Sequence, residues 1–560
     1  MDSPFLDRLN TNYNATTREI HQIRQIISEA LLERSRIDDE IEKLRLRQKE
    51  IDEYVSGHRT IVSPFRRLPV ELIQRVFVHT LPPHNSVMSA KEAPMLLGRV
   101  CSSWRHMSLS TPLLWSSLHL RVPVNLRRDV SLQTRYGDAV AAWLSRSGDL
   151  PLSISFVEGG DDRDGWFDYR YKERTERPSY LLNVLLGFSS RWKHLNFKLI
   201  HRYQKTFSRL SETDTPLLET VALEVTCCVE SFVGPHSLSF LGTPSLKSLS
   251  IDHSELSTPS ALPVRWENLT KIHFAQNTRL KEAMIILRKC SRLVACALAL
   301  EFDGLVPNGV LEHAVYLPYL ETLRVIAVPD LNLLASDPVT YSENAARFLE
   351  AIHSPKLRHL HFSTGDRVLS HTVITSFLER QKVDIHSLSF IVGRDQTASL
   401  LANLESVPSI QLLHIDGKPS YDNSWDVYEV LPPILNEVFF AQITPTVSAS
   451  SQRYLLPYLK DVDFRLQNSS EVTDETILRF ILARTSGAPD GVSCLRRAHF
   501  TFGRVQGIDI LPRLQSVIEE GLEIRLTYEA NIDDNPPRAP FDPCSDMEFA
   551  ENRDEWMPGF

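Results

Sequence analysis

The sequence predicts an α/β protein with three parts: a long N-terminal helix, a small all-α unit, and a solenoid whose strands form a parallel sheet. Three observations support this fold class. An apolar stripe of helical period runs through residues 20–55, two shorter stripes follow between residues 68 and 104, and a short phrase then recurs along the chain. At 560 residues the chain is too long for one core, so we expect two to four units.

The first part is predicted as a coiled-coil helix over residues 18–57, after a flexible N-terminus at residues 1–17. Steps of three and four residues alternate along a seam, which is the signal of a coiled coil. The seam positions are Ile20, Ile23, Ile27, Ala30, Arg34, Ile37, Ile41, Leu44, Gln48, Ile51 and Val55. Residues 20–55 therefore form either a parallel homodimer or a single amphipathic helix that packs on its own chain or stands free. We expect Gly57 to end the helix.

The second part, residues 62–120, carries the two shorter stripes. Pro69 suits the first turn of a helix, and Glu71 in that turn complements the helix dipole. The stripes are Leu72-Ile73 with Val76-Phe77, and Leu96-Leu97 with Val100-Cys101 and Trp104. Three short helices cannot bury so much apolar surface among themselves, so the rest of the chain or a partner must cover it.

The order of these residues resembles an F-box. The residues that match are Leu68, Pro69, Glu71, Leu72, Ile73, Val76, Phe77, Val100, Cys101, Trp104, Arg105, Leu114 and Trp115. The succession of coiled coil, F-box and long Leu-rich region resembles the large F-box families of mushroom-forming fungi. The resemblance implies that the apolar face docks on a Skp-type linker subunit, and through it on the cullin of a ubiquitin ligase.

The resemblance also implies which side chains bind the linker. The candidates are Leu68, Pro69, Glu71, Leu72, Ile73, Val76, Leu97, Val100 and Trp104. Among the matched residues we expect Trp104 and Cys101 to be mostly internal, and Leu68, Pro69, Leu72 and Val76 to lie mostly at the interface. The alternative is that the same residues form the core of a private three-helix unit.

The third part, residues 150–530, repeats a phrase of three apolar residues separated by two residues and then by one. The phrases begin at Trp192, Leu218, Leu246, Leu269, Leu293, Leu320, Leu357, Ile385, Ile410, Leu435, Leu459 and Leu495. Most of the gaps between them lie in the 20–29 residue range of a leucine-rich repeat. One strand per repeat would stack in parallel, which predicts an irregular leucine-rich-repeat-like solenoid.

Side chains alternate along a strand, so residues between the apolar members should point to an exposed concave face. The candidate target-binding residues there are His194, His273, Arg324, His359, His361, His414, Asp461, Asp463 and His499. Each of them also fits an ordinary solvated face. His359 and His361 share a face as zinc ligands can, but no third ligand follows at a defined spacing, so no metal site is predicted.

Nothing in the sequence indicates catalysis. The chain lacks a GxxxxGK[ST] loop, a GxGxxG helix opening, HExxH and GxSxG, so we expect no enzyme activity and no cofactor. A net charge of -9 with dispersed Lys and Arg disfavours nucleic acid. The seven cysteines form no CxxC pair, no signal peptide is evident, and the longest apolar run is too short for a membrane span. A cytoplasmic or nuclear location is therefore expected.

Two function hypotheses follow. The first is a substrate-recognition adaptor of an SCF-type cullin-RING ubiquitin ligase, in which the F-box holds the linker and the repeats hold an unknown target protein. The alternative is a non-catalytic oligomeric interaction scaffold, in which the F-box-like helices only cap the solenoid. Residues 158–180 are predicted as a polar surface loop, and the acidic, Pro-rich residues 531–560 as a disordered tail.

Overall fold

The structure is a computed structural model, and it divides the chain into two compact units, Met1–His79 and Thr80–Phe560. It describes residues 3–122, 130–157, 180–200, 204–226, 235–253, 258–302, 309, 311–328, 338–363, 371–381, 384–391, 397–416, 435–445, 454–466 and 472–528. The predicted tail at 531–560 and all but the last residue of the predicted loop at 158–180 lie outside these residues.

The first unit contains the helices α1 (Thr17–Ile61) and α2 (Val70–His79). Thr16 caps α1, because the Glu19 carboxylate accepts hydrogen bonds from its N–H and its hydroxyl at 2.8 and 2.6 Å. The prediction that Gly57 ends α1 is wrong, since the helix continues to Ile61. A glycine inside a helix costs only about 1 kcal/mol, and no proline follows until Pro64.

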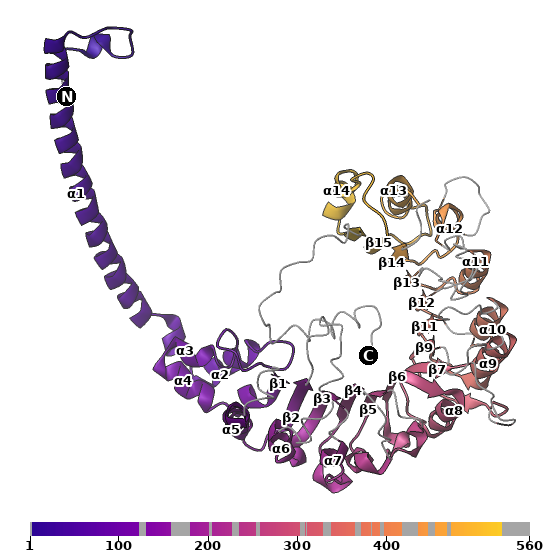
Figure 1. The fold of residues 1–560 in the computed structure, drawn as a ribbon. Helices are drawn as coiled ribbons and strands as arrows, with labels where there is room; N and C mark the ends of the chain where they lie inside the picture. Colours follow the sequence, from indigo (N-terminus) through magenta and orange to yellow (C-terminus); the bar gives the residue numbers. More distant parts are fainter. Residues whose placement is uncertain are drawn as a thin grey trace. The chain divides into compact units, whose positions relative to one another are not determined.

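The second unit begins with three short helical segments, α3 (Leu97–Val100), α4 (Ser102–Leu109) and η3 (Pro112–Trp115). Among the described residues, ten further α-helices follow: α5 (Val130–Arg146), α6 (Tyr180–Leu186), α7 (Gln204–Phe207), α8 (Leu280–Lys289), α9 (Pro338–Ala351), α10 (His371–Gln381), α11 (Thr397–Glu405), α12 (Glu437–Ile443), α13 (Asp474–Ala483) and α14 (Leu511–Glu519). In Figure 1 the helices α5 to α14 lie on the outer side of a curved sheet.

The sheet has fourteen parallel strands, ordered along the chain. They are β1 (Ser117–Arg121), β2 (Leu152–Val157), β3 (Trp192–Ile200), β4 (Thr220–Thr226), β5 (Ser248–His253), β6 (Lys271–Arg279), β7 (Ala295–Glu301), β9 (Thr322–Val328), β11 (His359–Ser363), β12 (Ser387–Ile391), β13 (Leu412–Asp416), β14 (Asp461–Leu466), β15 (Arg497–Phe502) and β16 (Glu523–Tyr528). A separate pair joins β8 (Val315–Tyr316) to β10 (Ile352–His353). The predicted α/β solenoid with a parallel sheet is confirmed.

Eleven of the twelve predicted phrases place their last two apolar residues on strands of this sheet, β3 to β7, β9 and β11 to β15. The phrase that begins at Leu435 is wrong, because residues 437–443 form α12. Asn436 caps this helix by accepting a hydrogen bond from the Phe439 N–H at 3.0 Å, which commits the following residues to a helical turn. The sheet also begins at Ser117, before the predicted start of the solenoid at residue 150.

The core lies between the sheet and the helices. Phe464 of β14 is buried, and its ring centroid lies 5.8 Å from Phe439 and 5.9 Å from Phe440, both of α12. It also lies 5.8 Å from Phe500 of the next strand, so aromatic contacts run from repeat to repeat. Because side chains alternate along a strand, the residues beside these apolar positions point away from the helices. We call that side of the sheet the helix-free face.

Candidate docking surfaces

The apolar stripe of α2 is divided between the interior and the surface. Ile73 and Phe77 are buried, whereas the neighbouring Leu72 and Val76 are 45% and 42% exposed. Successive residues of a helix point about 100° apart, so each adjacent apolar pair contributes one side chain to each region. Leu68, just before α2, is also exposed.

The other candidates near α2 lie at its first turn. Pro69 is exposed, and its carbonyl accepts hydrogen bonds from the N–H groups of Leu72 and Ile73 at 3.1 and 3.2 Å. Glu71 is exposed in the same turn. Ile73, which we expected among the linker-binding residues, is buried within the chain and presents no apolar surface. Leu68, Pro69, Glu71, Leu72 and Val76 remain accessible.

The second predicted stripe is not one helix. Cys101 takes an extended conformation (φ -159°, ψ 171°) between α3 and α4, and its Sγ accepts a hydrogen bond from the Trp104 N–H. Cys101 is therefore exposed at a helix N-terminus, contrary to the expectation that it is internal. Arg105 joins the two helices across this break, because its Nε donates to the Gly98 carbonyl at 2.7 Å.

The break determines which candidates of this stripe reach the surface. Leu97 is buried, contrary to its expected place at the interface. Val100 is exposed, and Trp104 is half-buried. Leu96, which the family pattern does not include, is also exposed. Two adjacent leucines give no sequence signal for which of them faces water.

One row of side chains crosses the helix-free face through all fourteen strands, and we call it the central row. The strand register aligns His119, Ser155, Asn196, Ala222, Ser250, His273, Ala297, Arg324, His361, Ser389, His414, Asp463, His499 and Arg525. Six of the predicted target-binding residues belong to the central row: His273, Arg324, His361, His414, Asp463 and His499. His194, His359 and Asp461 lie in the adjacent row.

Neighbouring members of the central row bond to each other. Nδ1 of His361 lies 2.7 Å from the Ser389 hydroxyl, and Nδ1 of His414 lies 2.9 Å from Oδ2 of Asp463. Two similar His–Ser pairs, His119 with Ser155 and His273 with Ser250, occur nearer the start of the sheet. Parallel strands about 4.8 Å apart bring side chains of one row within hydrogen-bonding reach. The serines, absent from the predicted set, occupy the same phrase position as the histidines.

The pairing buries part of the predicted face. His361 and Asp463 are both only 6% exposed, contrary to the expectation that they lie at an open surface. Burial lowers the pKa of His361 to about 3, and the nearby Arg324 and His414 add to the effect. Burial also lowers the pKa of His194 and of His359. These imidazoles are therefore neutral at pH 7.

Several polar atoms of this region keep an unused hydrogen-bonding capacity. Nε2 of His361, Nδ1 of His359, Oγ of Ser387, and Oδ1 of Asp416 and of Asp461 are buried without a hydrogen-bond partner. Leaving such a group unpaired costs about 1–3 kcal/mol. They all lie on β11 to β14, so buried polar atoms without a hydrogen-bond partner are concentrated in this part of the helix-free face.

Among the residues that the structure describes, we find no group of side chains arranged as a catalytic site. These residues contain no group of three His, Cys, Asp or Glu side chains able to hold a metal ion, and no helix long and apolar enough to cross a membrane. Burial raises the pKa of Cys290 to about 12, and it raises the pKa of Cys296 as well. Both thiols therefore stay protonated at pH 7.

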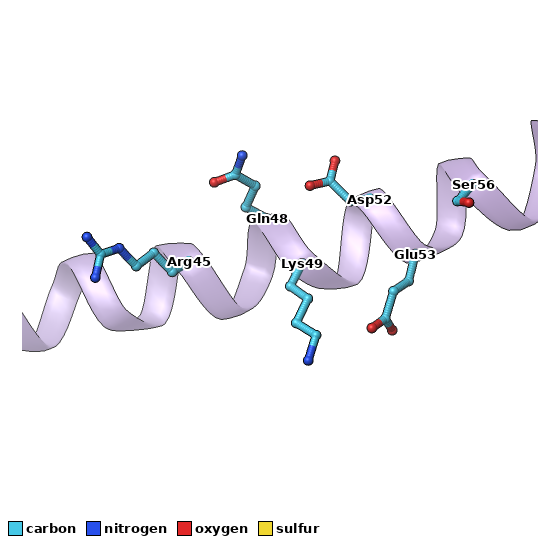
Figure 2. Close-up of a pocket in the computed structure, with 6 residues that line it drawn as sticks. All are labelled: Arg45, Gln48, Lys49, Asp52, Glu53 and Ser56. Carbon is cyan, nitrogen blue, oxygen red and sulfur yellow. The ribbon is translucent and has the colours of Figure 1, made fainter. Parts of the chain in front are cut away.

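A shallow hollow on α1 has the wrong shape for a substrate site. Figure 2 shows the six side chains that line it: Arg45, Gln48, Lys49, Asp52, Glu53 and Ser56. Gln48 and Asp52 project from one side of the helix, and Lys49 and Glu53 from the opposite side. The groups do not converge on a common point, so this region is an open helix surface.

Comparison with known proteins identifies no family. No family model and no curated protein matches the chain. Among solved structures, the crystal structure of the Rad7 and Elc1 complex in yeast is similar at 14% identity, covering 76% of this chain and 94% of that chain, with a TM-score of 0.33. A likeness at this level carries no argument about function.

Proposed function

We propose that the chain is a non-catalytic substrate-recognition adaptor of an SCF-type cullin-RING ubiquitin ligase. The segment from Leu68 to Trp104 docks on a Skp-type linker subunit, and the helix-free face of the sheet holds the target protein. The adaptor forms and breaks no bonds itself. It raises the effective concentration of the target near the ubiquitin-charged enzyme, in the cytoplasm or nucleus.

The exposed half of the α2 stripe is the observation that carries this proposal. Leu72 and Val76 stand four residues apart in α2, so they form an exposed apolar ridge along the helix, and Leu68 is exposed two residues before the helix begins. An amphipathic helix that lays such a ridge into an apolar groove is a common mode of recognition. Burying a leucine or valine side chain contributes about 1.5–3 kcal/mol. A partner that covers this ridge would therefore gain several kcal/mol of binding free energy.

The target-binding half of the proposal draws on the helix-free face. Its accessible side chains include the half-buried His273, Arg324, His414 and His499. A target with complementary donors and acceptors would bind these side chains. Capture with the full chain, with the proteasome blocked, followed by mass spectrometry would identify the target protein.

Binding of the purified full chain to a Skp-type linker subunit tests the docking half. We expect Leu72→Asp plus Val76→Asp to weaken binding by at least about 100-fold, because two carboxylates would be forced into an apolar groove. The matched control is Leu217→Asp plus Val505→Asp, which changes two exposed apolar residues elsewhere. The control should bind as tightly as the parent chain. Equal binding by both double variants and the parent would contradict the proposal.

A second candidate, the non-catalytic scaffold, is favoured by the packing of the last matched residues. Leu114 and Trp115 are buried in the second unit, and the Trp115 ring lies 4.7 Å from that of Trp143 in α5. The Trp115 Nε1 donates to the Ser108 carbonyl at 2.8 Å, which ties η3 to α4. These contacts suit a cap on the solenoid. A scaffold of this kind would not bind the linker at all, so the same experiment separates the two candidates.

A further inference from the structure

The helix α1 exposes most of its apolar seam to water, with Ile23 and Ala30 half-buried. The helix has 45 residues, and Ile27, Ile37 and Ile51 on the seam are each about half exposed. Ile20, Ile41, Leu44 and Val55 are exposed as well. A single helix gains most of its stability from packing an apolar face, so a seam of this length needs a partner.

The seam defines two sets of positions. With Ile20 at heptad position a, the a residues are Ile20, Ile27, Arg34, Ile41, Gln48 and Val55, and the d residues are Ile23, Ala30, Ile37, Leu44 and Ile51. Both polar seam residues, Arg34 and Gln48, therefore stand at a, and every d residue is apolar. In Figure 2 Gln48 and Asp52 lie on one side of the helix, while Lys49 and Glu53 lie on the other.

We propose that residues 20–55 pair in parallel and in register with the same segment of a second copy of this chain. In a parallel pair each a residue meets the same residue of its partner, so Arg34 meets Arg34 and Gln48 meets Gln48. In an antiparallel pair a meets d, and both polar residues would be buried against apolar side chains. The positions of Arg34 and Gln48 therefore favour the parallel arrangement.

The flanking charges match the same arrangement. A parallel pair brings each g residue near the e residue of the next heptad in the partner. Three of these contacts join opposite charges: Glu19 with Arg24, Glu40 with Arg45, and Arg47 with Asp52. A fourth, Ile26 with Leu31, is apolar and widens the seam.

The remaining contact fixes the register. Glu33 and Asp38 would face each other with like charge, but Arg34 lies beside them, and its Nε is already 3.7 Å from Oδ2 of Asp38. In register, two Arg34 side chains meet four carboxylates. A shift of one heptad would bury each Arg34 against Ile27 or Ile41 instead.

Sedimentation over a concentration series measures the mass of the purified full chain in solution. The assay contains no linker and no target, so it tests the pairing alone. We expect the parent chain to sediment at twice its 63.9 kDa. Ile27→Asp plus Ile41→Asp should raise the dimer dissociation constant by at least about 100-fold. The matched control, Leu32→Asp plus Leu46→Asp, places the same charges on exposed leucines off the seam and should leave the dimer intact.

Two outcomes would overturn the pairing: a monomeric parent chain at micromolar concentration, or equal weakening by both double variants. Circular dichroism of each variant verifies that α1 stays helical. Since the assay contains no linker, failure of the proposed ligase role leaves this result unaffected.

A charge exchange tests the parallel orientation. Glu40→Lys should raise the dissociation constant about fivefold, because two symmetric contacts with Arg45 become repulsive. Adding Arg45→Glu to the same chain should restore the parent value, since both contacts regain opposite charges. A double variant as weak as the single one would refute the parallel arrangement.

Discussion

Single side chains on the helix-free face are positioned by partners one repeat away. Ser389 holds His361, and Asp463 holds His414, each from the neighbouring strand. Four such pairs lie along the central row: they bury His119, Ser155, His361, Ser389 and Asp463, whereas Ser250, His273 and His414 stay half-buried. The surface offered to a target consists of the members that stay accessible, which include the exposed Asn196 and Arg525 and the half-buried His414.

The buried His361 makes stability depend on pH. Its pKa of about 3 in the folded chain lies below the ~6.5 of an unfolded chain. The unfolded state therefore binds more protons between these values, and stability falls as the pH drops from 7 toward 4.5, by about 2 kcal/mol. His361→Asn, which keeps a group near the Nδ1 position and does not titrate, should show a correspondingly smaller loss in urea unfolding at the two pH values. An unchanged pH dependence would contradict the assignment.

Arg484 is a second residue whose role only the structure reveals. Its side chain is fully buried after α13 and donates to the carbonyls of Ile443, Leu455 and Leu456 at 2.8–3.0 Å. Burial lowers its pKa to about 10, so it stays charged at pH 7.

Arg484→Met should lower the free energy of unfolding by about 3–5 kcal/mol, because two buried carbonyls and one part-buried carbonyl lose their donor. Urea denaturation followed by circular dichroism measures the loss. Arg496→Met, at an exposed arginine twelve positions later, is the control and should change stability by less than about 0.5 kcal/mol. Equal stability of the two variants would show that the three contacts contribute nothing.

At the scale of elements, α12 shows where the repeat pattern misleads. Leu435, Val438 and Phe440 fit the strand phrase, in which all three would point inward. As a helix, the segment buries Phe439 and Phe440 and leaves Val438 60% exposed. The Asn436 cap decides the outcome, and a cap is a local signal that the three-residue phrase does not contain.

Paired substitutions in α12 test this assignment. Val438→Asp should change the free energy of unfolding by less than about 0.5 kcal/mol, as at an ordinary surface position. Phe439→Ala should cost about 3–5 kcal/mol, because it removes a ring that packs on Phe440 and Phe464. Thermal unfolding of both variants gives the comparison. A strand in this place would reverse the order of the two effects.

For the whole molecule, the solenoid is readable from sequence because each repeat buries its own local set of apolar residues. The strands of the large sheet that escape prediction lie at its ends. Trp115-Leu118-Leu120 fits the phrase but equally fits the end of the F-box pattern, and β2 begins after Pro151 without the first apolar member. The edge strand β16 alternates between exposed and half-buried residues and shows no apolar triplet.

The candidate sites are less predictable than the fold. The sequence marks Leu72, Ile73, Val76 and Phe77 as one apolar stripe, but only packing decides which half of it faces water. Likewise, the phrase places His361 and Asp463 on the helix-free face, and their burial depends on neighbours that are 28 and 49 residues away in the sequence. Long-range contacts of this kind leave no local pattern.

On our proposal, the apolar side chains left exposed on α2 bind a linker subunit. Backbone hydrogen exchange of the full chain, with and without a Skp-type linker, measures this most directly. We expect slower exchange in residues 68–79 and 97–104 when the linker is added, with unchanged exchange in β3 to β15. Absence of binding, or slower exchange confined to the sheet, would contradict the proposal.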